Sequence, residues 1–164
     1  REHGRFDVHW SDLAEFDLPV FEEPHHPRQQ NYQHEHTRRW AASVDAADAY
    51  VLVVPEYNHG PTPALLNALN YVYHEWNYKP AAFVSYGGVS GGIRSVEMTK
   101  LTLTTLKVMP IVEQVTIPMV SQSVSGDSFN PTDQQASSGT AMLNELERWA
   151  EALRPLRNVS NRPS

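Results

Sequence analysis

The run Ala49-Tyr50-Val51-Leu52-Val53-Val54, closed by Pro55, decides the fold of this 164-residue chain. It is an uninterrupted apolar stretch that contains several β-branched residues. A run of this length predicts a strand that is buried on both faces, which is typical of a parallel sheet. The loop that follows, residues 55–63, is dense in Pro, Gly, Asn and His, and it leads into a predicted helix over residues 64–73.

The alternation of strand and helix continues on both sides of this run. A second buried strand is predicted at Ala81–Tyr86, a further strand at Val112–Ile117 and a half-buried strand at Phe6–Trp10. Amphipathic patterns predict helices over Thr37–Ala47, Ile93–Lys107 and Met142–Leu156, with loops at 13–36 and 118–139. This order indicates βαβ units and a three-layer α/β sandwich, whose ligand site is expected at the carboxyl ends of the strands.

Composition narrows the class of protein. The chain weighs 18.5 kDa, which fits one domain over residues 1–164, and 40% of its residues are apolar. A net charge of −6 disfavours nucleic acid as a partner, and no apolar run reaches the roughly 18 residues of a membrane span. The chain has no cysteine, which excludes disulfides, zinc–thiolate sites and a cysteine nucleophile, and which fits a cytoplasmic protein.

Two motifs in this frame resemble the NADPH-dependent FMN reductase family. The first is Pro55-Glu56-Tyr57-Asn58-His59-Gly60, with the helical stretch Pro63–Leu69 behind it. The second begins at His74-Glu75-Trp76, passes Lys79-Pro80 and ends at Ser85-Tyr86-Gly87-Gly88. The resemblance runs from about Phe6 to Leu156. It implies a flavodoxin-like fold with a five-stranded parallel sheet in the order 2-1-3-4-5.

One part of the family pattern is not found at the start of the chain. The resemblance implies a first strand and a Gly/Ser/Thr/Arg loop for the FMN phosphate ahead of the first helix. Here Arg1-Glu2-His3-Gly4 reads as the last turn of a helix with glycine just past its end. We therefore expect an N-terminal segment that this sequence lacks, because a gap at the centre of a sheet leaves backbone groups unpaired.

The resemblance also implies which residues bind the cofactor FMN. The expected cofactor-binding residues are Pro55, Glu56, Tyr57, Asn58, His59, Ser85, Tyr86, Gly87, Gly88, Gly91 and Gly92. The first loop would form a shelf beside the isoalloxazine ring, and the glycines of the second would let the backbone approach closely. NADPH or NADH is the expected electron donor, and a flavin, quinone, azo compound or metal oxyanion the expected acceptor. No residue is singled out as catalytic, because the redox chemistry is the cofactor's.

Other interpretations stay open. A flavodoxin-type electron carrier would share the fold without NAD(P)H activity, although such a carrier is expected to be more acidic. Gly88-Val89-Ser90-Gly91-Gly92 matches the G-x-S-x-G pattern of hydrolases, but no histidine follows it in the sequence. The histidines within residues 25–36 match no standard metal spacing, and Thr37 is expected to cap the helix that follows them.

The helix at 93–107 carries two apolar stripes. Ile93, Val96, Leu103 and Leu106 lie on one side, and Met98, Leu101 and Val108 lie on the other. One stripe covers the sheet, so the second predicts a subunit interface, in agreement with the resemblance to a family of homodimers and homotetramers. Arg94, at the start of this helix, is expected to face FMN, the nicotinamide nucleotide, a partner subunit or solvent.

Overall fold

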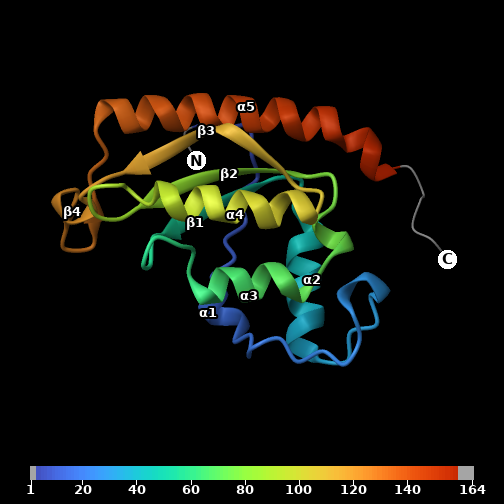
Figure 1. Cartoon of the computed structure of the whole chain (residues 1–164). Coiled ribbons are helices and arrows are strands. Elements are labelled where there is room, and N and C mark those ends of the chain that lie inside the picture. Colours follow the sequence, from blue (N-terminus) through green and yellow to red (C-terminus); the bar gives the residue numbers. More distant parts are fainter. Residues whose placement is uncertain (1–2, 159–164) are drawn as a thin grey trace.

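Helices and strands alternate along the part of the chain that the structure describes, residues 3–158 of a computed structural model (Figure 1). In chain order the α-helices, 3-10 helices (η) and strands are α1 (Leu13–Phe16), η1 (Pro27–Gln29), α2 (Glu35–Ala46), β1 (Tyr50–Pro55), α3 (Pro63–Tyr71), η2 (His74–Trp76), β2 (Pro80–Tyr86), α4 (Ile93–Thr105), β3 (Met109–Ile117), η3 (Val120–Gln122), β4 (Val124–Ser125), β5 (Ser128–Phe129) and α5 (Asp133–Asn158). The strands predicted at 49–54, 81–86 and 112–117 and the predicted helices are present, with shifts at their ends.

Three parallel strands form the main sheet, in the order β1-β2-β3. The register runs from Tyr50 beside Ala81 to Pro55 beside Tyr86, so β1 and β2 end at the same edge. Tyr86 also pairs with Ile117, which brings the end of β3 to that edge. The continuous apolar runs therefore form a parallel sheet, and its carboxyl edge gathers the loops that follow all three strands.

The predicted five-stranded sheet is not confirmed. Within residues 3–158 the parallel sheet has three strands, and β4 and β5 pair only with each other in a short antiparallel hairpin. Phe6–Trp10, predicted as a strand, forms none. Side chains of α5 lie beside it instead: Arg5 donates a hydrogen bond to Glu147 at 2.8 Å, and Phe6 packs on the apolar cluster around Met142. Because no strand backbone adjoins the segment, it has no ladder of hydrogen bonds.

The remaining segments differ in smaller ways from the prediction. Residues 13–36 contain α1 and η1, and residues 118–139 contain the β4–β5 hairpin and the first turns of α5. Arg1 and Glu2 lie outside the described residues, as does the helix end predicted there, while Gly4 has a φ of 72°. Among the described helices, none is long and apolar enough to cross a membrane.

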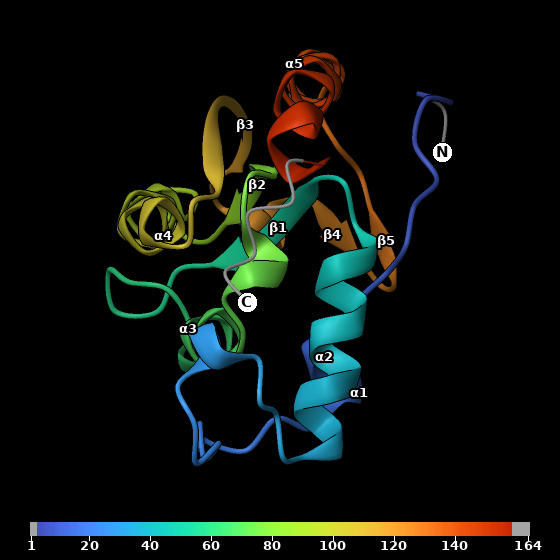
Figure 2. The same ribbon diagram turned by 90° about the vertical axis from the view of Figure 1, so that its right-hand side faces the viewer.

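Helices cover the sheet from two sides (Figure 2). On one face, α5 packs along β3 and β2 and contributes Met142 and Leu146 to an apolar cluster that includes Ala82. On the other face, α2, α3 and α4 surround a second cluster that includes Ala81 and Phe83. Successive residues of a strand point to opposite faces, so β2 supplies both clusters. This is the predicted three-layer α/β sandwich.

β1 is buried less than the sequence predicts. Val54 is 2% exposed, whereas Val51 is 40% and Val53 is 53% exposed. Val51 pairs with Ala82 and Val53 with Val84, so both lie on the face of the sheet that α5 covers. However, α5 packs mainly on β3 and β2, whereas β1 forms the other edge of the sheet. One face of β1 is therefore open in the described part of the chain, which corrects the prediction of a strand buried on both faces.

Thr37 does not cap α2, because the helix begins two residues before it, at Glu35. The N-cap residue, His34, makes no side-chain cap of its own. Instead, the carboxylate of Glu23 accepts hydrogen bonds from the backbone N–H groups of Gln33 at 2.7 Å and His34 at 3.0 Å. The start of α2 is thus fixed by a residue of the preceding segment, and Thr37 is fully buried within the helix.

The two apolar stripes of α4 are confirmed in part. Val96, Leu103 and Leu106 are buried, and Met98 and Leu101 are exposed, as predicted. For two residues the predicted side of the helix is wrong. Ile93, the first residue of α4, is 42% exposed, and Val108 is buried because it follows the end of the helix and turns into the core.

Candidate functional site

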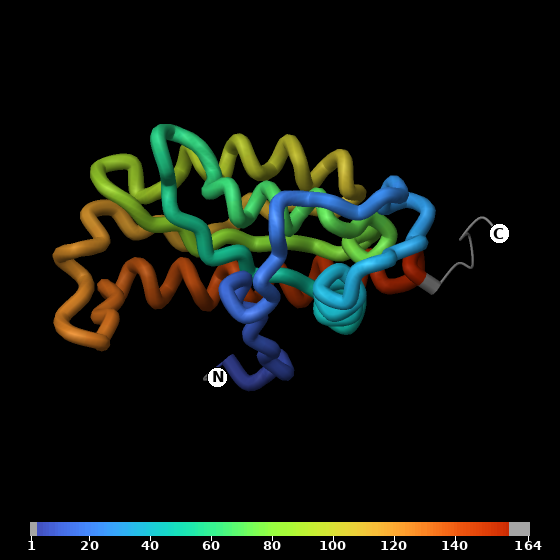
Figure 3. The backbone as a smooth tube through the Cα atoms, turned by 90° about the horizontal axis from the view of Figure 1, so that it is seen from below, coloured from blue at the N-terminus to red at the C-terminus, as the bar shows by residue number. Residues whose placement is uncertain are grey.

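The loops that follow β1, β2 and β3 lie at the same end of the molecule, as Figures 1 and 3 show. They are residues 56–62, 87–92 and 118–123. In an open parallel α/β sheet, ligands bind outside the carboxyl ends of the strands. All of the residues that the resemblance assigns to FMN lie in the first two loops or at the strand ends that lead into them.

The first loop is a closed turn. The N–H of Tyr57 donates to the carbonyl of Gly60 at 2.9 Å, and the N–H of Gly60 donates back at 2.9 Å. The two central residues, Asn58 and His59, have φ values of 49° and 69°, as in a type I′ turn. Tyr57 is 60% exposed, and Asn58 and His59 are exposed as well. The turn therefore presents its side chains outward from a backbone that is fixed by its own hydrogen bonds.

The second loop requires glycine at two positions for steric reasons. Gly91 and Gly92 have φ values of 60° and 85°, which favour glycine. A Cβ on Gly91 would lie 2.5 Å from Cγ2 of Thr116, and a Cβ on Gly92 would lie 2.8 Å from the carbonyl oxygen of Tyr86. Both residues are buried, so this turn packs tightly on the ends of β2 and β3.

Ser85 lies beneath the same turn. Its side chain is fully buried, and a Cβ on Gly92 would lie 3.0 Å from its Cβ. Among the described residues, its hydroxyl has no hydrogen-bond partner. The serine thus underlies the loop, whereas the more exposed Tyr86 and Gly87 lead into it.

Gly88 differs from the other glycines of the loop. A Cβ at this position would have no atom within 4 Å, and the next residue, Val89, is 90% exposed. The loop after β3 fixes the backbone here, since the N–H of Met119 donates to the carbonyl of Gly88 at 2.8 Å and that of Val120 to Gly87 at 3.1 Å. An anchored backbone beside open space fits the requirement of a planar ring for close contact with main-chain groups.

Glu56 links the two loops. Its carboxylate accepts hydrogen bonds from Oγ of Ser90 at 3.0 Å and from Nε of Arg94 at 2.7 Å. The hydrogen bond from the Arg94 side chain, followed by that from Ser90, holds the pKa of Glu56 below its usual range despite the opposing effect of desolvation. Sequence reasoning missed this contact, because Glu56 and Arg94 are 38 positions apart and nothing local signals their pairing.

The same contacts involve Arg94 and Ser90, two residues whose roles the sequence left open. Arg94 binds Glu56 of its own chain. Ser90 donates to Glu56 and accepts a hydrogen bond from Arg94 at 3.2 Å, and no histidine forms a hydrogen bond with it among the described residues. A serine nucleophile requires a base within hydrogen-bond reach, so the G-x-S-x-G pattern does not form a nucleophile elbow here.

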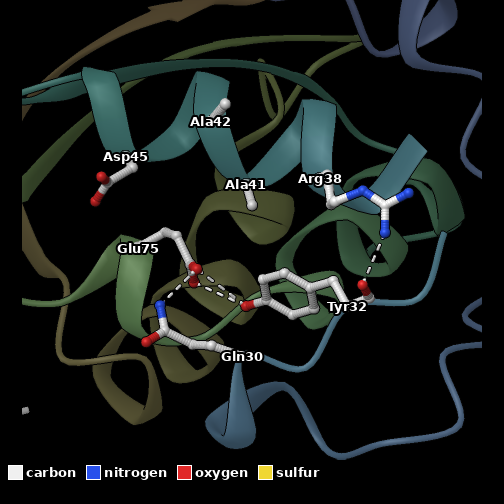
Figure 4. Close-up of a pocket in the computed structure, with 7 residues that line it drawn as sticks. All are labelled: Gln30, Tyr32, Arg38, Ala41, Ala42, Asp45 and Glu75. Carbon is white, nitrogen blue, oxygen red and sulfur yellow. Dashed lines mark hydrogen bonds between the residues drawn. The ribbon is translucent and has the colours of Figure 1, made fainter. Parts of the chain in front are cut away.

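A separate pocket of about 360 Å³ lies between α2 and η2 (Figure 4). Its lining residues are Gln30, Tyr32, Arg38, Ala41, Ala42, Asp45 and Glu75. Glu75 is 5% exposed, and its carboxylate accepts hydrogen bonds from Tyr32, Gln30 and the backbone N–H of Tyr73. These donors already occupy the carboxylate, which ties residues 27–34 to η2. In residues 3–158 there is also no group of three or more His, Cys, Asp or Glu side chains placed to hold a metal ion.

Comparisons with known proteins agree on one family. Residues 1–122 match the model of the family described as NADPH-dependent FMN reductase. The chain is 37% identical over 121 residues to an NAD(P)H-dependent FMN reductase of Schizosaccharomyces pombe, which spans 72% of this chain and 60% of that protein. It is 30% identical over 144 residues to another such reductase, from a Nectria species, across 85% of this chain and 68% of the relative.

Two further proteins extend the comparison. An NADPH azoreductase of a Bacillus strain is 30% identical over 69% of this chain and 62% of its own length. Among solved structures, the flavoenzyme NAD(P)H:(acceptor) oxidoreductase FerB of Paracoccus denitrificans superposes with a TM-score of 0.72 at 21% identity, covering 91% of this chain and 82% of FerB. The fold is therefore flavodoxin-like, as predicted. The match to the yeast and Bacillus relatives spans about three fifths of their length.

Proposed function

The chain belongs to the NADPH-dependent FMN reductase family, and we propose that it is an FMN-dependent NAD(P)H oxidoreductase. The observation that carries this proposal is the position of the two family motifs. They meet at the carboxyl edge of the parallel sheet, where a flavodoxin-like fold binds its ligand. NADPH or NADH is the proposed electron donor, and a small molecule is the proposed acceptor.

The proposed FMN site uses the residues named from the sequence, in three roles. Pro55, Glu56, Tyr57, Asn58 and His59 form the shelf on one side of the isoalloxazine ring. Tyr86, Gly87 and Gly88 offer backbone on the other side, and the open space beside Gly88 supports this placement. Ser85, Gly91 and Gly92 are buried, so their proposed role is to hold that backbone in place from below.

FMN, when bound, would accept an electron pair from NAD(P)H and give it to the acceptor. The chain's own contribution is to bind and orient the reacting molecules. α4 begins directly behind the second loop, and its N-terminus favours negative charge nearby. No protein nucleophile is required. Tyr57, which is 60% exposed, His59 and Tyr86 are all near enough to the loops to supply a proton, and none of them is favoured over the others.

The acceptor is proposed only as a class. Flavins, quinones, azo compounds and metal oxyanions all accept an electron pair from reduced flavin and require no covalent attachment to the protein. The Bacillus relative is named for azo reduction, which makes an azo dye a sensible first substrate to assay. Two statements from the sequence stay predictions. One is that residues 1–164 form a single FMN-binding domain, and the other is that the protein is cytoplasmic.

The first test is a visible absorption spectrum. The purified chain is mixed with FMN, excess flavin is removed, and the spectrum is recorded. We expect retained flavin bands at about one FMN per chain. A colourless protein from this chain, and again from one extended to the length of its relatives, contradicts the proposal.

A flavodoxin-type electron carrier is the second candidate, because it shares the fold. The assay that separates the two is NADPH oxidation, followed by absorbance, with a quinone as acceptor. A reductase consumes NADPH in proportion to enzyme, whereas a carrier retains FMN and leaves NADPH unchanged. The modest net charge of −6 favours the reductase, since carriers dock on basic partners through a strongly acidic surface.

We further propose that the protein is a homodimer with α4 in the interface. Met98 and Leu101 are 52% and 73% exposed on this helix, and Ile93 at its start is 42% exposed. Met98 and Leu101 are three residues apart and so lie on one side of the helix, and neighbouring exposed apolar side chains of this kind favour a partner surface. A Cβ on Gly60 would lie 3.5 Å from Sδ of Met98, so the stripe adjoins the first loop. The proposed interface therefore lies beside the proposed flavin site.

A further inference from the structure

The carboxylate of Glu56 accepts several hydrogen bonds within the candidate site. Its side chain is 7% exposed. Oε2 accepts hydrogen bonds from Oγ of Ser90 at 3.0 Å and from the backbone N–H of Arg94 at 3.2 Å. Oε1 accepts one from Nε of Arg94 at 2.7 Å and forms an ion pair with the same guanidinium. We refer to Glu56, Ser90 and Arg94 together as the Glu56 cluster.

The backbone contact gives this cluster a second role. Gly92 is the N-cap residue of α4 and has no side chain with which to cap the helix. The first N–H groups of a helix have no partner within it. The N–H of Arg94, the second residue of α4, is instead satisfied by Glu56 from the loop after β1. One carboxylate thus completes the start of a helix and neutralises the arginine that begins it.

The cluster also joins two loops that have no strand contact with each other at this point. Glu56 directly follows β1, and Ser90 lies in the loop after β2. A Cβ on Gly87, at the start of the second loop, would lie 3.9 Å from Cβ of Glu56. Arg94 Nη2 donates to Ser90 Oγ at 3.2 Å, which closes the cluster into a ring of contacts. Beyond the last strand pair, Pro55 with Tyr86, side chains therefore link the two loops.

We propose that Glu56 is a positioning residue, which sets the distance between the two FMN-binding loops through Ser90 and Arg94 and does not contact the flavin with its own side chain. This inference rests on the proposed function. It assigns the carboxylate a role different from that implied by the resemblance, while the backbone of Glu56 stays available to the ring. It also gives Arg94 a structural partner, so the guanidinium is not a free anion-binding group.

The test is a double-mutant cycle in which the affinity for FMN is measured by the quenching of flavin fluorescence. E56Q keeps the shape of the side chain and removes its charge, and R94Q removes the partner. We expect each single variant to weaken FMN binding about tenfold, and the double variant E56Q/R94Q to bind no more weakly than the worse single variant. R94K keeps the charge without the forked geometry, and we expect it to recover part of the loss.

The matched control is E97Q, which breaks the exposed pair of Glu97 with Lys100 on the same helix. We expect it to leave FMN affinity unchanged. If the side chain of Glu56 contacts the flavin directly, E56Q weakens binding while R94Q behaves like E97Q. Effects of the two single variants that simply add in the double variant likewise overturn the proposal.

A second readout needs no FMN. Amide hydrogen exchange of the flavin-free chain is expected to accelerate within residues 87–94 in E56Q and in R94Q, and to stay unchanged there in E97Q. Unchanged exchange in all three variants overturns the positioning role, even if the wild-type chain binds FMN. If the wild-type chain binds no FMN while E56Q still loosens residues 87–94, the positioning role stands and the proposed function fails.

Discussion

His59 occupies a backbone conformation that its side chain makes costly. It is the second central residue of the turn after β1, with a φ of 69°. A non-glycine residue in the left-handed region costs roughly 1–2 kcal/mol, and Asn tolerates it better than most. Strain of this kind gathers at functional sites, where the surrounding structure imposes it. The hydrogen bonds between Tyr57 and Gly60 impose it here.

We expect His59→Gly to stabilise the protein. The backbone strain that glycine removes costs more free energy than the conformational entropy that glycine adds to the unfolded chain. The free energy of unfolding should therefore rise by about 0.5–1 kcal/mol. Urea denaturation measures this value, and Asn58→Gly serves as a control with a smaller expected gain. A loss of stability in His59→Gly contradicts this account and assigns the imidazole a packing role.

Lys79 provides a pH-dependent test. Its ammonium group donates to the carbonyl oxygens of Val44 and Asp45, both at 2.9 Å, and the residue is 4% exposed. Burial lowers the pKa of Lys79 to about 8, against the opposing effect of Asp45. In the unfolded chain the pKa returns to about 10.4. Between these values the unfolded chain binds more protons, so the free energy of unfolding rises with pH.

We therefore expect the stability of the wild-type chain to increase relative to that of Lys79→Met between pH 8 and pH 10. The increase should approach about 1.4 kcal/mol for each pH unit in the middle of this range. Urea denaturation of both proteins at pH 7, 8.5 and 10 measures the difference. Parallel pH profiles contradict the lowered pKa.

At the scale of elements, α2 depends on a residue outside itself. Glu23 accepts the N–H groups of Gln33 and His34, at the start of the helix. Burial alone raises the pKa of Glu23, but several favourable contributions, of which the hydrogen bond from the Gln33 backbone is the largest, outweigh it and leave the pKa below its usual value. A carboxylate at a helix N-terminus is further stabilised by the helix dipole.

We expect Glu23→Gln to lower the free energy of unfolding by about 1–2 kcal/mol at pH 7. Since the folded-state pKa is the lower one, this contribution is present above pH 4.5 and is lost as the pH falls through the folded-state pKa. Thermal unfolding at pH 7 and pH 3 measures both values. The control is Glu22→Gln, whose side chain is 50% exposed. Equal losses in the two variants contradict the capping role.

Elements with a local signal were predicted well, and those that depend on distant partners were not. The apolar runs that form β1, β2 and β3 carry their own local pattern, so the existence of these strands follows from the sequence. Phe6–Trp10 also alternates correctly, but a strand forms only beside another strand, and none adjoins it in residues 3–158. The open face of β1 has the same origin, because coverage depends on where α5 packs.

The same difference between local and long-range signals holds for the candidate site. The closed turn at Tyr57–Gly60 and the glycines at 91 and 92 follow from short-range chemistry, and the motifs that contain them were recognised from the sequence. The Glu56 cluster was not predicted. Its members come from the loop after β1, the loop after β2 and the start of α4, and the parallel register of β1 and β2 brings these segments together. A long-range ion pair leaves no periodic pattern to detect.

At the scale of the whole molecule, the two faces of α4 have different surroundings. One side of the helix packs Val96 and Leu103 into the core over the sheet. The other side exposes Met98 and Leu101, and the turn after β1 lies against Met98. The N-terminus of the same helix lies at the Glu56 cluster. Any partner that covers the outer side of α4 therefore also borders the proposed flavin site.

We expect Leu101→Glu to convert the proposed homodimer into a monomer. In a two-fold symmetric interface each substitution occurs twice, so two uncompensated charges are buried and two leucine contacts of about 1.5–3 kcal/mol each are lost. Size-exclusion chromatography with light scattering measures the mass. The control is Val112→Glu on β3, which is 81% exposed but lies outside α4 and should leave the dimer intact. A wild-type monomer, or a dimer that survives Leu101→Glu, contradicts the assignment of α4 to the interface. A wild-type tetramer that Leu101→Glu reduces to dimers supports it and requires a second interface elsewhere on the molecule.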